Sequence, residues 1–251
     1  MPYLGYLLAQ AIKAGETITS AISSAASFVT KVGGSVVDLS PSVEPLKSPS
    51  DGSAYINDGV DTTISAINGS DMTVCCWVYF DADNSVIRTV WASQENAGHG
   101  YQFLQRYAAT TTFRSMWGTG SSGTSYVFSS AGTAIDNKWI HVACVHTSSK
   151  NYIYVNGELD GEANAGTTVG ASSTYKIGAY GSINSYSLYG NVANWGMWQR
   201  ALSAEEIRSV MNKSYDELSA SETKGLLSWH ALDSLENNVS IDSHGNYNGT
   251  Y

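Results

Sequence analysis

Aromatic side chains beside polar loops are the residues of this sequence best suited to binding chemistry. Trp117 precedes the Gly- and Ser-rich segment 118–123, and Tyr180, Tyr186 and Tyr189 lie in a stretch rich in Gly, Ser and Asn. Such rings give large, rigid contact areas, while neighbouring amides and hydroxyls give adaptable hydrogen bonds. A carbohydrate site needs both kinds of group in one concave place. We therefore predict ligand binding at these four aromatics, with buried rings between neutral turns as the alternative.

The acidic residues do not form a pattern that predicts catalysis. Hydrolysis of a glycosidic bond needs two carboxyl groups about 5–10 Å apart across that bond. Glu95, Glu158 and Glu162 are isolated in the sequence, and Glu205 and Glu206 belong to a predicted helix cap. The motifs of serine hydrolases, zinc proteases and phosphate-binding loops do not occur. Although residues distant in the sequence could still converge, we predict no catalytic residues and no enzyme activity.

Two aspartate pairs have the chemistry for calcium, which prefers carboxylate and carbonyl oxygens. They are Asp58 with Asp61 and Asp81 with Asp83. Aspartate suits turns equally well, because its side chain bonds the nearby backbone. We therefore expect no metal and no other cofactor, and calcium at one of these pairs is the alternative.

The histidine, cysteine and tryptophan residues of the apolar runs fit a buried core better than a reactive site. His141 lies in an apolar run and is predicted to be structural. The sequence has an odd number of cysteines, Cys75, Cys76 and Cys144. Adjacent strand residues point to opposite faces, so Cys75 and Cys76 cannot simply share a partner, and we predict buried free thiols. Free thiols fit assembly in a reducing compartment. Core positions rather than ligand platforms are also predicted for Trp139, Trp195 and Trp198.

Low charge separates this chain from several classes of protein. Charged residues make up only 14% of the sequence, and the net charge is −9. Nucleic-acid backbones and anionic membranes attract basic patches, so we expect neither partner. The most apolar stretch, residues 4–12, is too short to span a membrane. It also lacks the preceding basic region of a secretory signal.

Residues 1–34 are predicted to form an amphipathic helix with too few charges to stay solvated alone. We expect it to act as an anchor that packs on its own copies, for example as a trimer, on another protein or on its own domain. Residues 35–50 contain three of the four prolines and are predicted to form an extended linker. The apolar positions of the helix alternate at spacings of four and three, as in a heptad seam: Leu4, Leu8, Ala11, Gly15, Ile18, Ile22, Ala25, Val29 and Val32.

Short runs of β-branched and aromatic residues, separated by Gly, Asn and Ser, predict strands from residue 51 onward. Asn156-Gly157 predicts a type I′ hairpin turn. Ser203 and Glu206 form a capping box that predicts one short helix near 203–211. Many short strands without βαβ alternation indicate an all-β, antiparallel two-sheet sandwich or jelly roll. The predicted strands are 72–80, 86–92, 101–107, 111–117, 126–129, 139–147, 151–155, 175–179, 190–198 and 226–232.

Several of these runs resemble a known family. Residues 139–143 read W-I-H-V-A, and 151–158 read N-Y-I-Y-V-N-G-E. With the later runs 175–179, 188–192 and 200–207, they resemble laminin-G-like, concanavalin-A-like jelly rolls over about residues 51–213. The resemblance implies a two-sheet sandwich, and in some relatives calcium binding or cleavage of polysaccharides. The acidic triplet of the cleaving relatives does not occur here, and the run after Gly190 lacks an aspartate that the family often uses for calcium.

The opening strand of that family usually stands first in the domain, but here its pattern stands last. Residues 225–233 read G-L-L-S-W-H-A-L-D, and 242–250 read D-S-H-G-N-Y-N-G-T. We therefore predict that 225–251 is a permuted closing strand of the jelly roll 51–251. Pairing of this tail with a neighbouring copy is the alternative.

A jelly roll carried on a helix through a proline-containing spacer suits display on a larger assembly. Similar jelly rolls occur in structural proteins of marine bacteriophages. The resemblance therefore favours a non-catalytic virion surface protein, meaning a capsid decoration protein, head fibre or spike. It would be assembled in the host cytoplasm and attached through its helix to a capsid or other virion protein. A lectin-like domain for host-surface glycans is the alternative, and an enzyme is the third hypothesis.

Overall fold

The computed structural model describes ten segments, all within the compact unit Val43–Tyr251. The predicted N-terminal helix with its seam from Leu4 to Val32, and the aspartates Asp58 and Asp83, lie outside the described residues. The described residues are 46–47, 59–64, 71–81, 87–93, 100–107, 110–119, 125–165, 174–180, 186–232 and 239–250.

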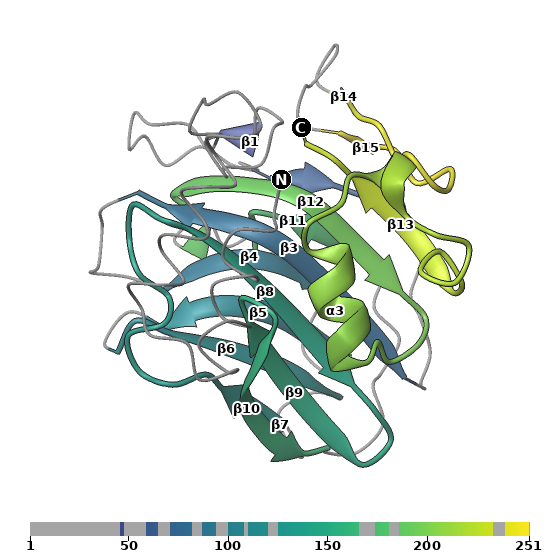
Figure 1. Ribbon diagram of the computed structural model, residues 1–251. Helices are drawn as coiled ribbons and strands as arrows, with labels where there is room; N and C mark the ends of the chain where they lie inside the picture. Colours follow the sequence, from purple (N-terminus) through teal and green to yellow (C-terminus); the bar gives the residue numbers. More distant parts are fainter. Residues whose placement is uncertain are drawn as a thin grey trace, which may run out of the picture. The chain divides into compact units, whose positions relative to one another are not determined.

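Two antiparallel sheets, here called sheet A and sheet B, form a sandwich (Figure 1). Sheet A has the strand order β1 (Leu46–Lys47), β12 (Gly190–Trp198), β3 (Met72–Phe80), β8 (Trp139–His146), β9 (Lys150–Val155) and β10 (Glu158–Asn164), and β13 (Leu226–His230) also pairs with β12. Sheet B has the order β14 (Val239–Ser240), β15 (Gly249–Thr250), β2 (Val60–Asp61), β11 (Tyr175–Ile177), β4 (Arg88–Ser93), β5 (Gly100–Tyr107), β6 (Thr112–Thr119) and β7 (Ser125–Phe128). The prediction of an all-β, antiparallel two-sheet jelly roll is confirmed.

Local sequence signals account for most of these strands. The runs of β-branched and aromatic residues at β3 and β12 begin and end where the sequence predicts. Asn156 and Gly157 have φ values of 50° and 83°, as a type I′ turn requires, and they return the chain as β10. The β10 sequence is too polar to predict a strand by itself, and its charged residues suit a sheet edge. The predicted linker contributes residues 46–47 to sheet A, where they pair with β12.

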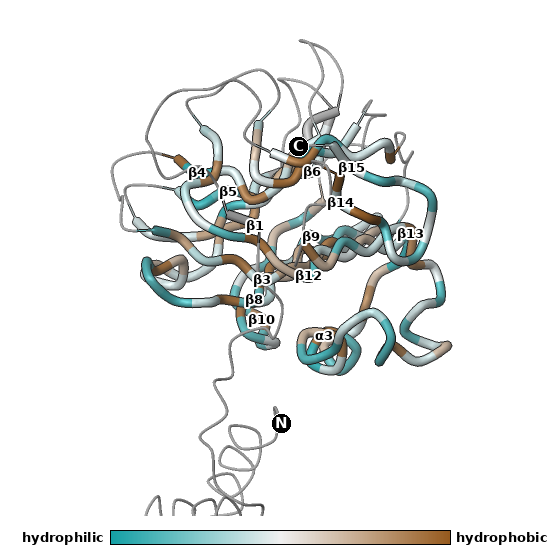
Figure 2. The backbone as a smooth tube through the Cα atoms, turned by 90° about the horizontal axis from the view of Figure 1, so that it is seen from above, coloured by the Kyte–Doolittle hydropathy of each residue, from teal (hydrophilic) through white to brown (hydrophobic). Residues whose placement is uncertain are grey.

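The core lies between the sheets, because alternate residues of each strand point inward. Apolar residues, brown in Figure 2, run along the strands, and the turns are mostly teal. Cys76 and Cys144 lie in this core, whereas Cys75 lies on the outer face of sheet A, as adjacent strand residues should. All three thiols are free, and burial raises their pKa values, that of Cys144 to about 12. The thiols therefore remain protonated and packed as small apolar groups.

The tryptophans predicted as core anchors differ in burial. Trp195 and Trp198 are fully buried. Trp139 is only half-buried, because it begins β8 beside the ring of Tyr79, with ring centroids 5.6 Å apart. The sequence therefore predicted two of these three side chains as core residues correctly and placed the third too deep.

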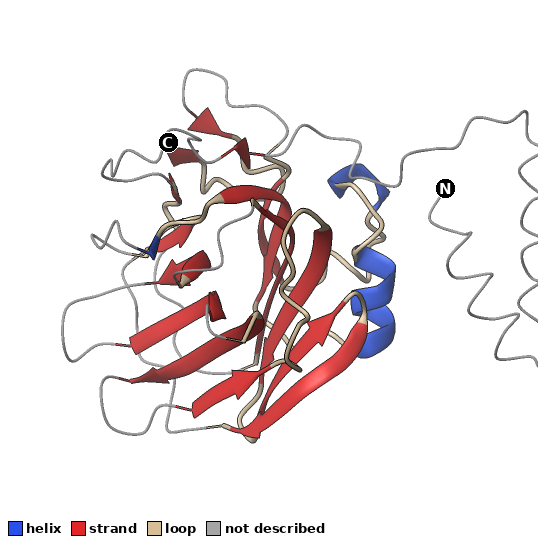
Figure 3. Cartoon of the chain, turned by 90° about the vertical axis from the view of Figure 1, so that its left-hand side faces the viewer, coloured by secondary structure: helices blue, strands red, loops and turns tan. Residues whose placement is uncertain are grey.

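The outer face of sheet A is covered by residues 199–225, here called the covering segment. It contains α3 (Ala204–Val210) and the 3₁₀ turn η2 (Tyr215–Glu217), and both lie on one side of the strands in Figure 3. The predicted capping box is present: Glu206 N–H donates to Ser203 Oγ at 3.2 Å, and Ser203 N–H donates to Glu206 Oε2 at 2.9 Å. The segment and sheet A bury a shared apolar cluster of Cys75, Ala143, Val145, Trp198, Leu202, Ile207, Val210, Leu226 and Trp229.

Polar contacts hold the covering segment in place. Lys213 Nζ lies 2.6 and 2.7 Å from the two carboxylate oxygens of Glu222. Burial alone would raise the pKa of Glu222, but hydrogen bonds from Lys213, Ser209 and Ser219 lower it to about 2. Trp198 Nε1 donates to the Glu222 carbonyl at 2.7 Å. The segment is therefore fixed to sheet A by hydrogen bonds and an ion pair as well as by apolar contact.

The C-terminal tail contributes strands to both sheets of its own sandwich. β13 pairs with β12 in sheet A, and β15 pairs with β2 in sheet B. Between them, Asp242 accepts hydrogen bonds from the backbone N–H groups of Trp229, His244 and Tyr247. Burial opposes ionisation of Asp242, yet these bonds lower its pKa. The tail therefore pairs with β12 and β2 of the same chain in this structure, and closure of the jelly roll by residues 225–251 stays a prediction.

None of the helices in the described segments is long and apolar enough to cross a membrane.

Candidate ligand-binding surface

The outer face of sheet B is defined by alternation along β5, β6 and β7. In β5, Leu104 points into the core, and its neighbours Phe103 and Gln105 point outward. In β6, Phe113 is a core residue, and Arg114 lies opposite Gln105 in register on the outer side. We call this surface the aromatic face, and its members are Phe103, Gln105, Tyr107, Arg114, Met116, Tyr126 and Phe128, together with Tyr180 and Tyr186 from the segments after β11.

Aromatic rings follow one another across this face at ordinary contact distances for ring pairs. Phe103 is almost fully buried among its neighbours, whereas Tyr126 is 41% exposed and Phe128 is 47% exposed. The face therefore presents two rings to solvent on a base of packed ones. Successive centroids lie 5.9–6.4 Å apart in the order Tyr186, Tyr180, Phe103, Tyr126, Phe128 and Tyr107.

Arg114 lies in the middle of these rings. Its Cζ atom is 4.8, 5.6 and 5.8 Å from the ring centroids of Tyr107, Phe103 and Tyr126. Its Nε and Nη2 atoms both donate to Gln105 Oε1, at 3.1 and 2.8 Å. Ring faces attract a guanidinium, and the two hydrogen bonds fix its plane. The aromatic face thus combines exposed rings with a positioned cation and an amide.

The structure brings two of the four sequence-predicted binding residues to this face. Tyr180 packs edge-on against Phe103, and Tyr186 packs against Tyr180. Tyr189 lies elsewhere, with the guanidinium of Arg88 5.3 Å from its ring centroid. Tyr180, Tyr186 and Tyr189 are each half-buried.

Trp117 lies on the core side of β6 and is fully buried. Its ring is 5.6 Å from that of Trp91 and stacks on the imidazole of His146 at 5.4 Å. A ring enclosed in this way cannot serve as an open platform for a ligand. The prediction placed Trp117 at a surface because it adjoins a polar loop, but strand alternation turns its side chain inward.

Sequence reasoning missed Arg114, Tyr126 and Phe128, which dominate the aromatic face. All three lie in strands that the sequence predicts, and each is the immediate neighbour of a core residue, Phe113 or Val127. The alternation in 126–129 places Tyr126 and Phe128 on one side and Val127 on the other. That pattern was a usable signal for two exposed rings, but it does not show which other rings adjoin them.

His141, the histidine of the family-like motif, is a structural residue on the covered face of sheet A. Its ring packs edge-on against Trp77 at 5.4 Å, and Trp77 Nε1 donates to the Met211 carbonyl of the covering segment. Burial lowers the pKa of His141 to about 3, so the imidazole is neutral near pH 7.

The described residues contain no group of three or more His, Cys, Asp or Glu side chains that could hold a metal ion. Asp61, one of the predicted calcium ligands, is paired with Lys176 on the neighbouring strand. Asp81 uses its backbone N–H to bond the Tyr189 carbonyl at 3.0 Å. Asp58 and Asp83 are outside the described segments, so the prediction of no metal stays untested, with calcium at either aspartate pair as the alternative.

The matching family model covers residues 51–208, which is more than half of the chain, and is described as the concanavalin A-like lectin/glucanases superfamily. The chain belongs to this superfamily. The match includes β3 to β12 and the start of α3, and it therefore contains the aromatic face. No curated protein matches the chain in sequence.

Several solved structures are similar to this chain at low sequence identity. A candidate carbohydrate-binding protein from Bacteroides ovatus is 17% identical, with a TM-score of 0.55, over 76% of this chain and 57% of that one. A heptameric pentraxin from Limulus polyphemus is 17% identical, with a TM-score of 0.47, over 70% of this chain and 83% of that one. Domain 4 of an arabinanase from Geobacillus stearothermophilus, solved with arabinotriose, is 15% identical, with a TM-score of 0.48, over 60% of this chain and 71% of that one. The chain spans little more than half the length of the Bacteroides protein.

Proposed function

We propose that this protein is a non-catalytic binding domain that holds carbohydrate on the aromatic face of sheet B. The observation that carries the proposal is the pair of exposed rings, Tyr126 and Phe128, beside the amide of Gln105 and the guanidinium of Arg114. Exposed apolar patches rimmed by polar groups mark binding surfaces in monomeric proteins.

The chemistry of the face suits a sugar. The apolar C–H groups of a pyranose ring pack on an aromatic ring, and its hydroxyls need donors and acceptors nearby. Tyrosine hydroxyls and the Arg114 guanidinium supply these groups within a rigid sheet, and the buried Gln105 amide holds the guanidinium in place. Membership of a superfamily named for lectins, and the carbohydrate-binding description of the Bacteroides structure, support the same class of ligand.

A glycan array with the full chain, followed by calorimetry on the best ligand, tests this proposal. We expect Tyr126→Ala and Phe128→Ala each to weaken binding about tenfold, because each removes one stacking platform worth about 1 kcal/mol. Leu159→Ala is the matched control, because Leu159 is 50% exposed on β10 of the other sheet. A protein that ignores every glycan, or binds one with both variants at full strength, would contradict the proposal.

We also propose that the domain is displayed on a virion surface, where it meets host-surface glycans. The proposal is supported by the seam from Leu4 to Val32, by the low charge of residues 1–34, and by the resemblance to bacteriophage structural proteins. Deleting residues 1–34 should abolish co-sedimentation with capsids and self-association, and should leave glycan binding intact. Unchanged assembly after that deletion would rule out the anchor.

A further inference from the structure

We infer that the aromatic face selects glycans that carry an anionic group, a carboxylate or a sulfate ester, and that Arg114 is its anchor. The inference rests on the proposed carbohydrate binding and specifies the ligand class for the same surface.

The partners of Arg114 distinguish it from three other arginines of the described segments. Arg106 pairs with Asp136 at 2.5 Å, Arg200 with Glu206 at 2.8 Å, and Arg208 with Glu158 at 3.2 Å. Arg114 instead contacts neutral groups, namely the amide oxygen of Gln105 and three rings. The chain has 22 acidic and 13 basic residues, so carboxylates are in excess. Arg114 is half-buried and has no carboxylate partner among the described residues, so its guanidinium can bind an anionic group of a ligand.

The geometry of Arg114 suits an anionic ligand. A guanidinium has five N–H donors, and two of them bond Gln105. The remaining three lie in the same fixed plane, which matches the oxygens of a carboxylate or sulfate in a paired arrangement. Because Gln105 and the rings already hold the plane, little side-chain entropy is lost when the anion binds.

Charge elsewhere limits the ligand to a local anion. The net charge of −9 repels long polyanions at a distance. At physiological ionic strength this repulsion is screened over about 8 Å, so a single acidic group placed at Arg114 is little affected. Farther along sheet B, Lys176 is neutralised by Asp61. We therefore expect a short acidic oligosaccharide with one charge at Arg114, with the neighbouring sugar ring on Tyr126 or Phe128.

Calorimetry with matched neutral and charged probes tests the inference. The probes are lactose, 3′-sialyllactose, 3′-sulfolactose, trigalacturonic acid and the methyl ester of that trimer. We expect the full chain to bind at least one charged probe about tenfold tighter than its neutral counterpart, as a charge-assisted hydrogen bond predicts. The sialylated and galacturonic probes report on a carboxylate, and the sulfated probe reports on a sulfate.

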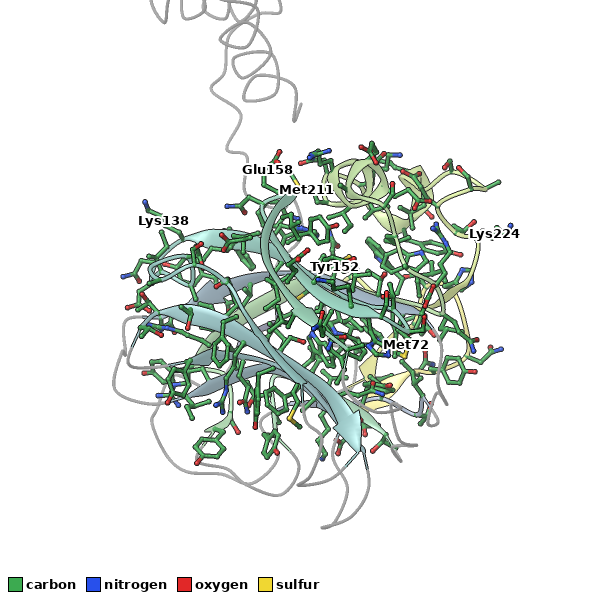
Figure 4. All side chains as sticks on the ribbon, turned by 90° about the horizontal axis from the view of Figure 1, so that it is seen from below. Met72, Lys138, Tyr152, Glu158, Met211 and Lys224 are labelled. Carbon is green, nitrogen blue, oxygen red and sulfur yellow. The ribbon has the colours of Figure 1, made fainter. Side chains whose placement is uncertain are left out.

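Arg114→Gln should abolish the preference for charge, so that each charged probe binds no tighter than its neutral counterpart. Arg114→Lys keeps the charge without the planar fork and should recover only part of the preference. Lys224→Gln is the control, because it removes the same charge from the covering segment, on sheet A (Figure 4). An unchanged melting temperature in each variant shows that the fold is intact.

The outcomes separate this inference from the function on which it rests. Equal binding of charged and neutral probes, or a charge preference that survives Arg114→Gln, would overturn the anionic selectivity and leave carbohydrate binding in place. A full chain that binds none of the probes, and no glycan on the array, would overturn both.

Discussion

Both sheets carry aromatic side chains on their outer faces, and among the described residues the covering segment buries a pair on sheet A, whereas a similar pair on sheet B stays exposed. Trp198 and Trp229 on sheet A are buried beneath the covering segment and meet edge-on with centroids 6.0 Å apart. Tyr126 and Phe128 on sheet B are about half exposed, with centroids 6.1 Å apart. Similar ring pairs thus stabilise the fold on one face and are open to a partner on the other.

Chain connectivity explains the difference. The covering segment leaves β12 and returns as β13, which pairs with β12, so it has to lie over sheet A. Both α3 and η2 lie on the sheet A side of the strands (Figure 3), and Tyr126 and Phe128 of sheet B are 41% and 47% exposed. Apolar area that the chain buries contributes to folding, whereas apolar area left on a rigid sheet can contribute to binding.

The largest effect should come from truncating one aromatic on each face. Trp198→Ala removes a buried indole and its hydrogen bond to the Glu222 carbonyl, and should lower the free energy of unfolding by about 3–5 kcal/mol. Phe128→Ala, at a side chain 47% exposed, should lower it by less than about 1 kcal/mol. Urea denaturation of both variants measures the difference. Equal losses would mean that the two faces are equally covered in solution.

The pH dependence of stability tests how tightly sheet A is covered. Burial lowers the pKa of His141 from 6.5 to about 3, so between these pH values the unfolded chain binds a proton that the folded chain does not. The stabilisation is complete above pH 6.5 and falls by about 1.4 kcal/mol per pH unit below it. Burial also lowers the pKa of His230 to about 4, which adds to the same trend.

Denaturation of the wild type and His141→Gln between pH 7.5 and 4 checks this expectation. In the variant, the free energy of unfolding should depend less steeply on pH, by the contribution of one proton, because glutamine does not titrate. A slope that stays the same in the variant would show that His141 is protonated normally, and so that the covering segment opens in solution.

The smallest effect concerns how α3 begins. Ser203→Ala removes the Oγ that accepts the Glu206 N–H and should cost about 1 kcal/mol of stability. Glycan binding on the aromatic face should remain unchanged, because the cap lies on sheet A. Weaker glycan binding in this variant would show that the two faces are coupled through the sandwich.

Elements with a local signal were predictable, and contacts between distant segments were not. The bounds of β3 and β12, the Asn156-Gly157 turn and the Ser203 cap follow from residues that are neighbours in sequence. The edge strand β10 has no apolar pattern, and β2, β14 and β15 have two residues each, so their pairing partners define them. The aromatic face needed the register of β5 with β6 and of β6 with β7.

By itself, the sequence determined an all-β sandwich with one capped helix, because alternation, turn residues and caps act over a few neighbouring positions. Only the tertiary structure decided which alternation set became the core and which remained outside. The aromatic residues of β6 lie on the inner set, and those of β7 lie on the outer set. The local pattern alone therefore does not tell Trp117 from Tyr126. Packing against sheet A buries Trp117, and the open outer face of sheet B leaves Tyr126 in solvent. The same arrangement sets Arg114 among rings instead of carboxylates.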